Sequence, residues 1–374
     1  MAYWSIGRMA FFNQTDMLIH WGNEAGDDLP LETADAQTLV SEILRARRMG
    51  KHLIVIEPQV LRILKELPLS AMDLSLVERL RDEFTQTGRA IKTIRPAINI
   101  VNTWEDQIHL DAGIVNVPLR VLLSSSILEA PILVLENQKR DGFLYGLALD
   151  SKRKHPITYN TSHGGGGDTP DVFEKEMAAK KVTVCAVDSD KYTPHTKKNE
   201  KLSAIITRKR RVNWPLGFPI SPNCREIENL IPPEVVFKLQ SAASHPNIQQ
   251  IKNICGSESP VPAEIFWNFF DIKKGVVHGK ARKLSGAEAT WLSEKLQIAG
   301  ITIPLEATPE MGDDPDEYVH LNGFGEKVVD QVMRSRDLTH EVSKSLSGER
   351  WDATFKESIE EMLAIFSSLE PIST

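Results

Sequence analysis

Two short apolar runs decide the fold of this chain: PILVLE at residues 131–136 and VTVCAVDSD at residues 182–190. Each is largely apolar without polar alternation, as is typical of a strand buried on both faces of a parallel sheet. Both end in carboxylates, Glu136 after the first and Asp188 and Asp190 after the second. Ligands of parallel sheets bind beyond the carboxyl ends of the strands. The sequence therefore predicts an α/β fold with these acids gathered at one sheet edge.

A third short strand, a glycine loop and a helix are expected between the two runs. Ile157 to Asn160 is the expected strand, and Asp171 to Lys180 has the composition of a helix. The loop lacks the Gly-Lys-Ser/Thr ending of a phosphate-binding loop, which argues against nucleotide hydrolysis. Its glycines would let the backbone pass close to a bound ion or substrate, and its histidine is either a phosphate contact or incidental. These loop residues are His163, Gly164, Gly165, Gly166 and Gly167.

This order of elements resembles the Toprim domain, the metal-binding catalytic module of topoisomerases, bacterial primases and the overcoming-lysogenization-defect nucleases. The resemblance covers residues 130–233 and implies a Rossmann-like parallel sheet. The segment Arg225-Glu226-Ile227-Glu228-Asn229 is similar to the Arg-Glu-Ile-Glu-Asn segment that follows the core in nuclease-type members, including those of phage-defence systems. In one departure, Asp141 stands five residues after Glu136, where the nuclease type often has an acid four residues after.

The resemblance implies a centre for Mg²⁺ or Mn²⁺ built from carboxylates, which are the oxygen ligands that Mg²⁺ prefers. Asp188 and Asp190 would reach one ion from the turn at the end of their strand. Glu136 would complete that site or act as general base for the attacking water. All three acids are candidate catalytic residues.

A second ion is expected at the segment that follows the core. Glu226 and Glu228 would hold it, with Asp141 as a further candidate ligand, and two ions would clamp the attacking and leaving oxygens of a phosphodiester. Nuclease-type members also carry a late lysine near the metals, which could stabilise developing negative charge. The candidates for it are Lys273, Lys274 and Lys280, and we take Lys274 as the candidate catalytic lysine.

A basic stretch directly follows the second run. Residues 191–211 hold eight lysines and arginines against the single acid Glu200, although the whole chain has a formal charge of −7. Such a run is either a solvated surface or the place where a phosphate backbone beside the metal site is neutralised. The candidate nucleic-acid contacts are Lys191, Lys197, Lys198, Arg208, Lys209, Arg210 and Arg211.

The length of 374 residues allows two or three domains. We divide the chain into an N-terminal α/β region at 1–128, a Toprim-like core at 129–233 and a mostly helical region at 234–374. The first region has no catalytic motif, and Ile108 to Val115 is expected there as a strand. Apolar spacing predicts an amphipathic helix from Glu349 to Leu369, whose stripe is assigned to core packing, with a partner surface as the alternative.

Composition places the chain among ordinary globular proteins, with 41% hydrophobic and 25% charged residues. No apolar run approaches the roughly 20 residues of a membrane helix, and the N-terminus lacks a signal-peptide pattern. We therefore expect a cytoplasmic protein without membrane contact. The three cysteines are odd in number and Cys185 lies in a predicted buried strand, so disulfides and a Cys-x-x-Cys zinc site are not expected.

Two functions follow as hypotheses. The first is a metal-dependent nuclease that acts on DNA, or less favourably RNA; the resemblance suggests an effector of bacterial anti-phage defence, with a partner protein from the same operon. The second is a non-catalytic, Toprim-like subunit that binds nucleic acid or a partner. The presence of the expected acids favours the first. A strand-passing topoisomerase needs a nucleophilic tyrosine, and none of the five tyrosines stands in a suitable context. A homo-oligomer is left open.

Overall fold

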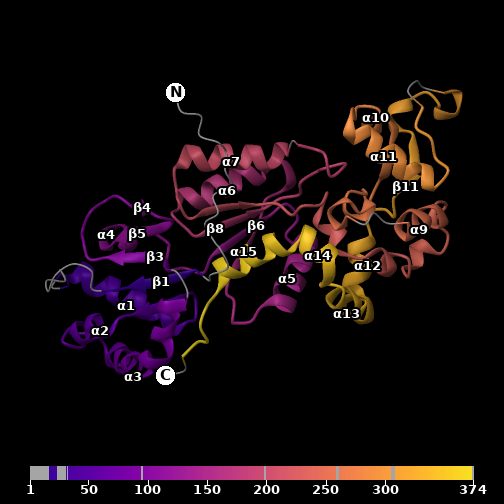
Figure 1. The fold of residues 1–374 in the computed structure, drawn as a ribbon. Coiled ribbons are helices and arrows are strands. Elements are labelled where there is room, and N and C mark those ends of the chain that lie inside the picture. Colours follow the sequence, from indigo (N-terminus) through magenta and orange to yellow (C-terminus); the bar gives the residue numbers. More distant parts are fainter. Residues whose placement is uncertain are drawn as a thin grey trace.

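Two separate sheets form the framework of the chain. The computed structural model describes residues 17–22, 31, 33–93, 96–197, 199–257, 261–304 and 308–372. Figure 1 shows the N-terminal sheet in indigo and purple, the second sheet in magenta beside it, and the orange C-terminal region on the far side of the second sheet. The yellow final helices run back across the second sheet toward the first.

The N-terminal sheet has the strand order β2-β1-β3-β5-β4, in which only β4 is antiparallel to its neighbour. Its strands are β1 (Leu18–Trp21), β2 (Leu53–Ile56), β3 (Pro96–Val101), β4 (His109–Asp111) and β5 (Ile114–Pro118). The accompanying helices are α1 (Ala34–Arg48), α2 (Pro58–Lys65), α3 (Ala71–Thr93) and α4 (Leu119–Leu123).

The prediction of one strand from Ile108 to Val115 is wrong, because the chain turns back within that range. Ala112 and Gly113 have φ angles of 45° and 85°, and they form the turn between β4 and β5. Glycine adopts such left-handed angles without steric cost, so the pair closes a hairpin.

The second sheet, here called the core sheet, is entirely parallel and has the order β7-β6-β8-β9. This confirms the expected α/β fold with a parallel sheet. The order reverses between β6 and β8, which makes their carboxyl ends the topological switch point. The strands are β6 (Ile132–Leu135), β7 (Asn160–His163), β8 (Thr183–Ala186) and β9 (Gly217–Ile220), and the helices are α5 (Arg140–Lys152), α6 (Thr169–Ala178) and α7 (Glu200–Val212).

The third strand of the core lies further along the chain than predicted. β7 runs from Asn160 to His163, whereas Ile157 forms only an isolated bridge with Ser367. β7 is an edge strand, and most of its residues are exposed. Polar Asn, Thr, Ser and His residues are tolerated in an exposed edge strand. The expectation of an apolar strand therefore places it too early in the sequence.

Beyond the core sheet the described part of the chain is mostly helical, and β10 pairs antiparallel with β11. Its helices of four or more residues and its strands are α8 (Pro233–Val236), α9 (Ile248–Gly256), β10 (Gly275–Val277), α10 (His278–Ala281), α11 (Ala287–Ile298), β11 (Val319–Asn322), α12 (Val328–Arg334), α13 (Arg336–Lys344), α14 (Gly348–Thr354) and α15 (Lys356–Phe366). Short 3₁₀ turns lie at Gly166–Asp168, Ile227–Leu230, Gln240–Ala242, Pro262–Glu264, Phe266–Asn268, Pro309–Met311 and Pro315–Glu317.

The last helix joins the two sheets. The helix predicted from Glu349 to Leu369 is in fact two helices, α14 and α15, with Phe355 between them. The assignment of the apolar stripe to core packing is confirmed, because Ile359, Met362 and Ile365 of α15 are fully buried. The Met17 N–H, just before β1, donates to the Ala364 carbonyl at 2.7 Å. α15 therefore ties the N-terminal sheet to the core sheet.

Among the described residues, no helix is both long and apolar enough to cross a lipid bilayer. The cysteines are free thiols: Cys185 and Cys224 are buried and Cys255 is partly buried.

Candidate functional site

Glu136 and Asp188 meet at the switch point of the core sheet. Glu136 follows β6, and Asp188 stands two residues after β8, the neighbouring strand in register with it. The backbone N–H of Asp188 donates to Glu136 Oε1 at 3.2 Å. The predicted convergence of these two strand ends is therefore present in the structure.

Asp190 faces one side of this junction together with Glu136. Its φ of 52° turns the chain sharply after Ser189, and its N–H donates to the Arg225 carbonyl at 3.0 Å. Lys201 Nζ lies 3.0 Å from Asp190 Oδ2 and 2.9 Å from Glu136 Oε2. One ammonium thus bridges two carboxylates that come from different strands.

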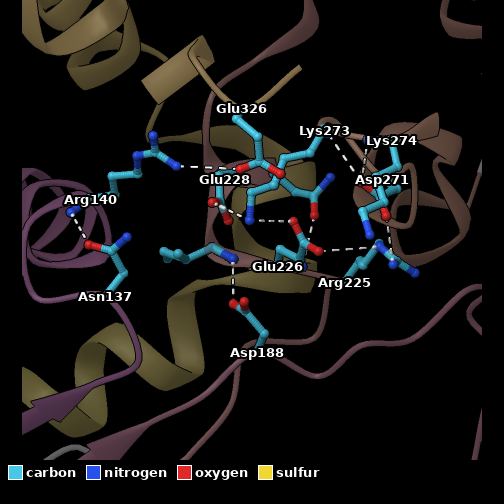
Figure 2. A network of polar contacts seen from close by, with 12 residues as sticks. Asn137, Arg140, Asp188, Arg225, Glu226, Glu228, Asp271, Lys273, Lys274 and Glu326 are labelled. Atoms are coloured by element: carbon cyan, nitrogen blue, oxygen red, sulfur yellow. Dashed lines mark hydrogen bonds and ion pairs between the residues drawn. The ribbon is translucent and has the colours of Figure 1, made fainter. Parts of the chain in front are cut away.

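Asp188 faces the other side, toward the segment that follows the core sheet. Its Oδ1 accepts the backbone N–H of Ile227 at 2.9 Å, between Glu226 and Glu228. Lys273 Nζ lies 3.2 Å from Glu226 Oε2 and 2.7 Å from Glu228 Oε1. Figure 2 shows Glu226, Glu228 and Lys273 together at the centre of the network, with Asp188 below them.

Asn229 holds this segment in place. Its side-chain amide donates to the carbonyls of Trp267 and Phe270 at 2.6 and 2.9 Å, and its Oδ1 accepts the Glu226 N–H at 2.9 Å. Asn229 is completely buried, so these bonds satisfy polar groups that water does not reach. The position of Glu226 and Glu228 therefore depends on contacts with the C-terminal region.

Arg225 provides a second anchor. Its Nη2 donates to Asp271 Oδ2 at 2.8 Å, and its guanidinium lies 4.2 Å from the centre of the Tyr192 ring. Lys280 Nζ also lies near that ring, at 5.2 Å. These contacts connect the loop after Asp190 to the region around α10.

Buried carboxylates repel one another at this junction. Burial raises the pKa of Asp188 well above its ordinary value, and the charges of Glu228 and Glu226 raise it further. Burial also raises the pKa of Asp141 to about 7, with Glu228 and Glu136 adding to the shift. Such crowding favours a bound cation because it disfavours the ionised acids on their own.

The two lysines stay protonated beside these acids. Burial lowers the pKa of Lys201, but Glu136 and Asp190 more than offset this, so that its pKa lies above the ordinary value. The pKa of Lys273 is raised in the same way, since Glu228 and Glu226 outweigh its burial. Each ammonium is a permanent cation at neutral pH.

The donor set fits a hard divalent ion, although the acids are at present paired with lysines. Glu228 is 3% exposed, and its Oε2 is buried without a hydrogen-bond partner. Such an oxygen is available to a cation, and carboxylate oxygen is the ligand type that Mg²⁺ prefers. Across the described ranges, no three His, Cys, Asp or Glu side chains stand close enough to hold a metal ion in this conformation.

The glycine loop packs against the end of β6. The Gly164 N–H donates to the Leu135 carbonyl at 2.7 Å, and the Gly166 N–H lies 3.4 Å from the Glu136 carbonyl. Gly165 and Gly166 have φ angles near 70°, whereas Gly167 does not adopt the left-handed region. His163 is exposed and accepts from the Gln138 N–H at 3.5 Å. The loop thus lies beside Glu136.

Two candidate residues occupy places that the sequence does not reveal. Lys274 is exposed and its backbone N–H donates to Asp271 Oδ1, so that Lys273 is the late lysine that reaches the acids. Asp141 lies in the first turn of α5, where its Oδ2 accepts the Asn137 N–H at 2.8 Å. It is close enough to Glu228 and Glu136 for their charges to raise its pKa.

Several side chains of the basic stretch already contact other residues of the protein. Arg208 is paired across to α6, with Asp171 at 2.6 Å and Glu174 at 3.0 Å. Lys209 Nζ lies 5.7 Å from the Phe218 ring centre, and burial lowers its pKa. The exposed members are Lys197, Arg210 and Arg211, and Arg211 also lies 3.5 Å from Glu174. The Lys191 ammonium donates to Asn223. Lys198 lies outside the described residues.

Lys201 is a site residue that the sequence analysis did not single out, because it is one of eight lysines and arginines in the basic stretch. A signal for it exists: Asn199 Oδ1 accepts the Leu202 N–H at 2.8 Å and caps α7. Asparagine is a favoured N-cap, so Asn199 at the start of a helical stretch predicts that Lys201 lies in the first turn of that helix.

Comparisons with known proteins leave the site to be interpreted from its own geometry. No protein-family model, no curated protein and no solved structure matches this chain.

Proposed function

We propose that this chain is a metal-dependent nuclease of Toprim type that hydrolyses phosphodiester bonds, with DNA favoured over RNA. The observation that carries the proposal is the position of Asp188. It lies at the switch point, its N–H binds Glu136, and its carboxylate binds the backbone between Glu226 and Glu228. Acids from three separate segments thus lie around Asp188 at the ligand-binding edge of a parallel sheet.

Each acid has a role in this proposal. Asp188, Glu226 and Glu228 would hold one Mg²⁺ or Mn²⁺ ion, and Glu136 and Asp190 would hold another. When bound, such ions supply a nucleophilic water at neutral pH and neutralise charge on the phosphate. Glu136, which is only partly buried, is also suited to accept the proton of the attacking water.

Lys273 contacts two of the buried acids directly. Its ammonium bridges Glu226 and Glu228, and a raised pKa keeps it charged. A fixed positive charge at this place would stabilise negative charge that develops on the phosphodiester oxygens. We therefore assign the late lysine to Lys273 in place of Lys274.

Cleavage assays with matched acid variants test this proposal. Purified protein is incubated with plasmid, linear DNA and RNA in Mg²⁺, Mn²⁺ or EDTA. Cleavage is expected with the metals and should be lost in Asp188→Asn and Glu136→Gln. Asp150→Ala is the control, since Asp150 is exposed on α5 and pairs with Arg153 away from the site. Activity in EDTA, or full activity of Asp188→Asn, would overturn the proposal.

One observation favours the second function, a Toprim-like subunit that binds nucleic acid or a partner without cutting. Lys201 and Lys273 form ion pairs with four of the acids. A binding subunit would use this arrangement as a permanent structural network. Calorimetry separates the two functions, because a nuclease must bind divalent ions and a purely structural network need not. A wild-type protein that shows no Mn²⁺ binding would favour the second function.

The defence setting and the partner protein are part of the same proposal. They rest on the similarity of the Arg225–Asn229 segment to that of phage-defence Toprim proteins. Co-expression of the neighbouring genes, followed by purification on a tag carried by this chain, tests for such a partner. The same preparation gives the oligomeric state by light scattering.

A further inference from the structure

Lys201 occupies the place of a cation between two carboxylates. Its Nζ lies 2.9 and 3.2 Å from the two Glu136 oxygens and 3.0 Å from Asp190 Oδ2. Glu136 comes from the end of β6 and Asp190 from the loop after β8, so these acids converge through the sheet and not through a shared turn. An ammonium that bridges both of them replaces the charge that a metal ion would supply.

The backbone of α7 fixes the position of Lys201 next to Glu136 and Asp190. It is the second residue of α7, whose first turn is fixed by the Asn199 cap, and the Asn199 side chain also donates to Ser221 Oγ at 3.1 Å. The side chain is still 41% exposed, so that its flexible stem can swing outward into solvent. Lys273, at 25% exposed, is more enclosed.

We propose that Lys201 is the resident counter-ion of the Glu136–Asp190 position and that a divalent ion must displace it to bind there. Lys201 is thus a positioning residue: it keeps two repelling acids together in the metal-free protein and sets the affinity of their site for metal. This inference rests on the proposed metal site, and it concerns which of the chain's own groups competes for that site.

A merely structural lysine would behave in the opposite way. If Lys201 only held the loops together, its removal would loosen the acids and weaken metal binding. If Lys201 competes for the acids, its removal tightens metal binding. Arginine, which keeps the positive charge, should restore the competition. The sign of the change in affinity therefore decides between the two roles.

Isothermal calorimetry with Mn²⁺ alone, without nucleic acid, measures this sign. Lys201→Met is expected to bind Mn²⁺ up to about fivefold more tightly than wild type, since a partly exposed ion pair contributes at most about a fivefold change in an equilibrium constant. Lys201→Arg should stay near wild type. The control is Lys181→Met: Lys181 also forms a short ion pair, 2.6 Å from Glu176 with 30% exposure, but outside the site.

Labelling of wild-type lysines gives a second readout that does not depend on how the variants fold. An amine-acetylating reagent should modify Lys201 slowly in EDTA and several-fold faster in saturating Mn²⁺, while Lys181 is unaffected. Unchanged labelling of Lys201, or Mn²⁺ binding in Lys201→Met no tighter than in wild type, overturns the inference.

The two proposals fail separately. Should Lys201→Met bind Mn²⁺ more tightly while wild type cuts no nucleic acid, the role of Lys201 stands and the nuclease proposal falls. Should wild type cut nucleic acid while Lys201→Met binds Mn²⁺ no more tightly, the nuclease proposal stands and the inference falls.

Discussion

The Asp188 N–H donates to Glu136 Oε1 at 3.2 Å, and this bond joins the ends of the two central strands of the core sheet. The same Asp188 accepts the Ile227 N–H through its carboxylate. A single residue therefore links the strand ends to the segment that carries Glu226 and Glu228. This linkage makes Asp188 the residue whose substitution is most informative.

We expect Asp188→Asn to stabilise the metal-free protein while it removes activity. Burial and the neighbouring acids raise the pKa of Asp188, so its ionised form is disfavoured in the folded state. Asparagine keeps an oxygen for the Ile227 N–H, and it cannot carry the charge whose burial is unfavourable. Thermal unfolding in EDTA measures this gain, and a lower melting temperature than that of wild type would contradict it.

The same variant should respond less to metal. A ligand at 100 times its Kd adds about 2.7 kcal/mol to the free energy of unfolding. Wild type is therefore expected to gain several degrees in Mn²⁺, and Asp188→Asn distinctly less. An equal gain in both proteins would exclude Asp188 as a ligand.

The glycine loop offers a matched pair of substitutions. A Cβ at Gly164 would lie 2.9 Å from the Leu135 carbonyl oxygen and closer still to the Thr169 hydroxyl, whereas a Cβ at Gly167 would meet nothing within 4 Å. Gly164→Ala should therefore cost about 1–3 kcal/mol of stability and displace the loop from Glu136. Gly167→Ala should leave both stability and activity near wild type. Urea unfolding of the two variants measures the difference, and equal effects would contradict it.

Asn229→Ala tests whether the C-terminal region builds the site. The change leaves the Trp267 and Phe270 carbonyls and the Glu226 N–H without their partner in a fully buried place. We expect a loss of at least about 3 kcal/mol, because three buried groups lose their partner and each costs about 1–3 kcal/mol. Mn²⁺ affinity should fall as well, since Glu226 moves. Asn253→Ala on α9 is the control, as the Asn253 side chain accepts from Gln249 away from the site.

The acids at the strand ends could be predicted because their position follows from local pattern. A buried parallel strand delivers the next residue to the ligand-binding edge, and Glu136 and Asp188 obey this rule. The partners of these acids could not be predicted in the same way. Lys201 reaches Glu136 across 65 residues of sequence, and Lys273 reaches Glu228 through the C-terminal region. Such pairings depend on packing between distant segments, which periodicity does not encode.

The choice between Lys273 and Lys274 shows the same limit. Adjacent residues point in different directions, and the direction depends on Asp271, whose Oδ1 accepts the N–H groups of both lysines at 3.1 and 2.8 Å. This local turn sends Lys273 to the acids and leaves Lys274 exposed. Composition alone carries no information on that turn.

His52 should make the protein sensitive to acid. Burial lowers its pKa from 6.5 to about 4, and its Nε2 lies 2.8 Å from the Glu129 carbonyl. Between these pH values the unfolded chain binds a proton that the folded chain does not, so stability is fully present above pH 6.5 and is lost as pH falls to about 4. The loss is about 3 kcal/mol. Urea unfolding from pH 7 to 4 measures it, and His52→Gln should lack this component.

The basic stretch is expected to contact phosphate through only some of its members. Arg210 is exposed, whereas Lys209 lies against Phe218 with a lowered pKa. If bound duplex DNA runs past α7, Arg210→Ala should lower the slope of log K against log salt by about 0.9. Lys209→Ala should leave that slope unchanged and cost stability instead. Binding is measured in Ca²⁺ by fluorescence anisotropy over a salt series.

Arg208 separates stability from binding on the same helix. Its two ion pairs, with Asp171 and Glu174, hold α7 to α6, so that Arg208→Ala should reduce the free energy of unfolding by about 1 kcal/mol. Because its guanidinium is engaged within the protein, the salt slope should change less than it does for Arg210→Ala. A full loss of 0.9 from the slope in Arg208→Ala would instead mean that Arg208 leaves Asp171 and Glu174 for the phosphate backbone. Equal slopes for Arg210→Ala and wild type would remove this face of α7 from the nucleic-acid path.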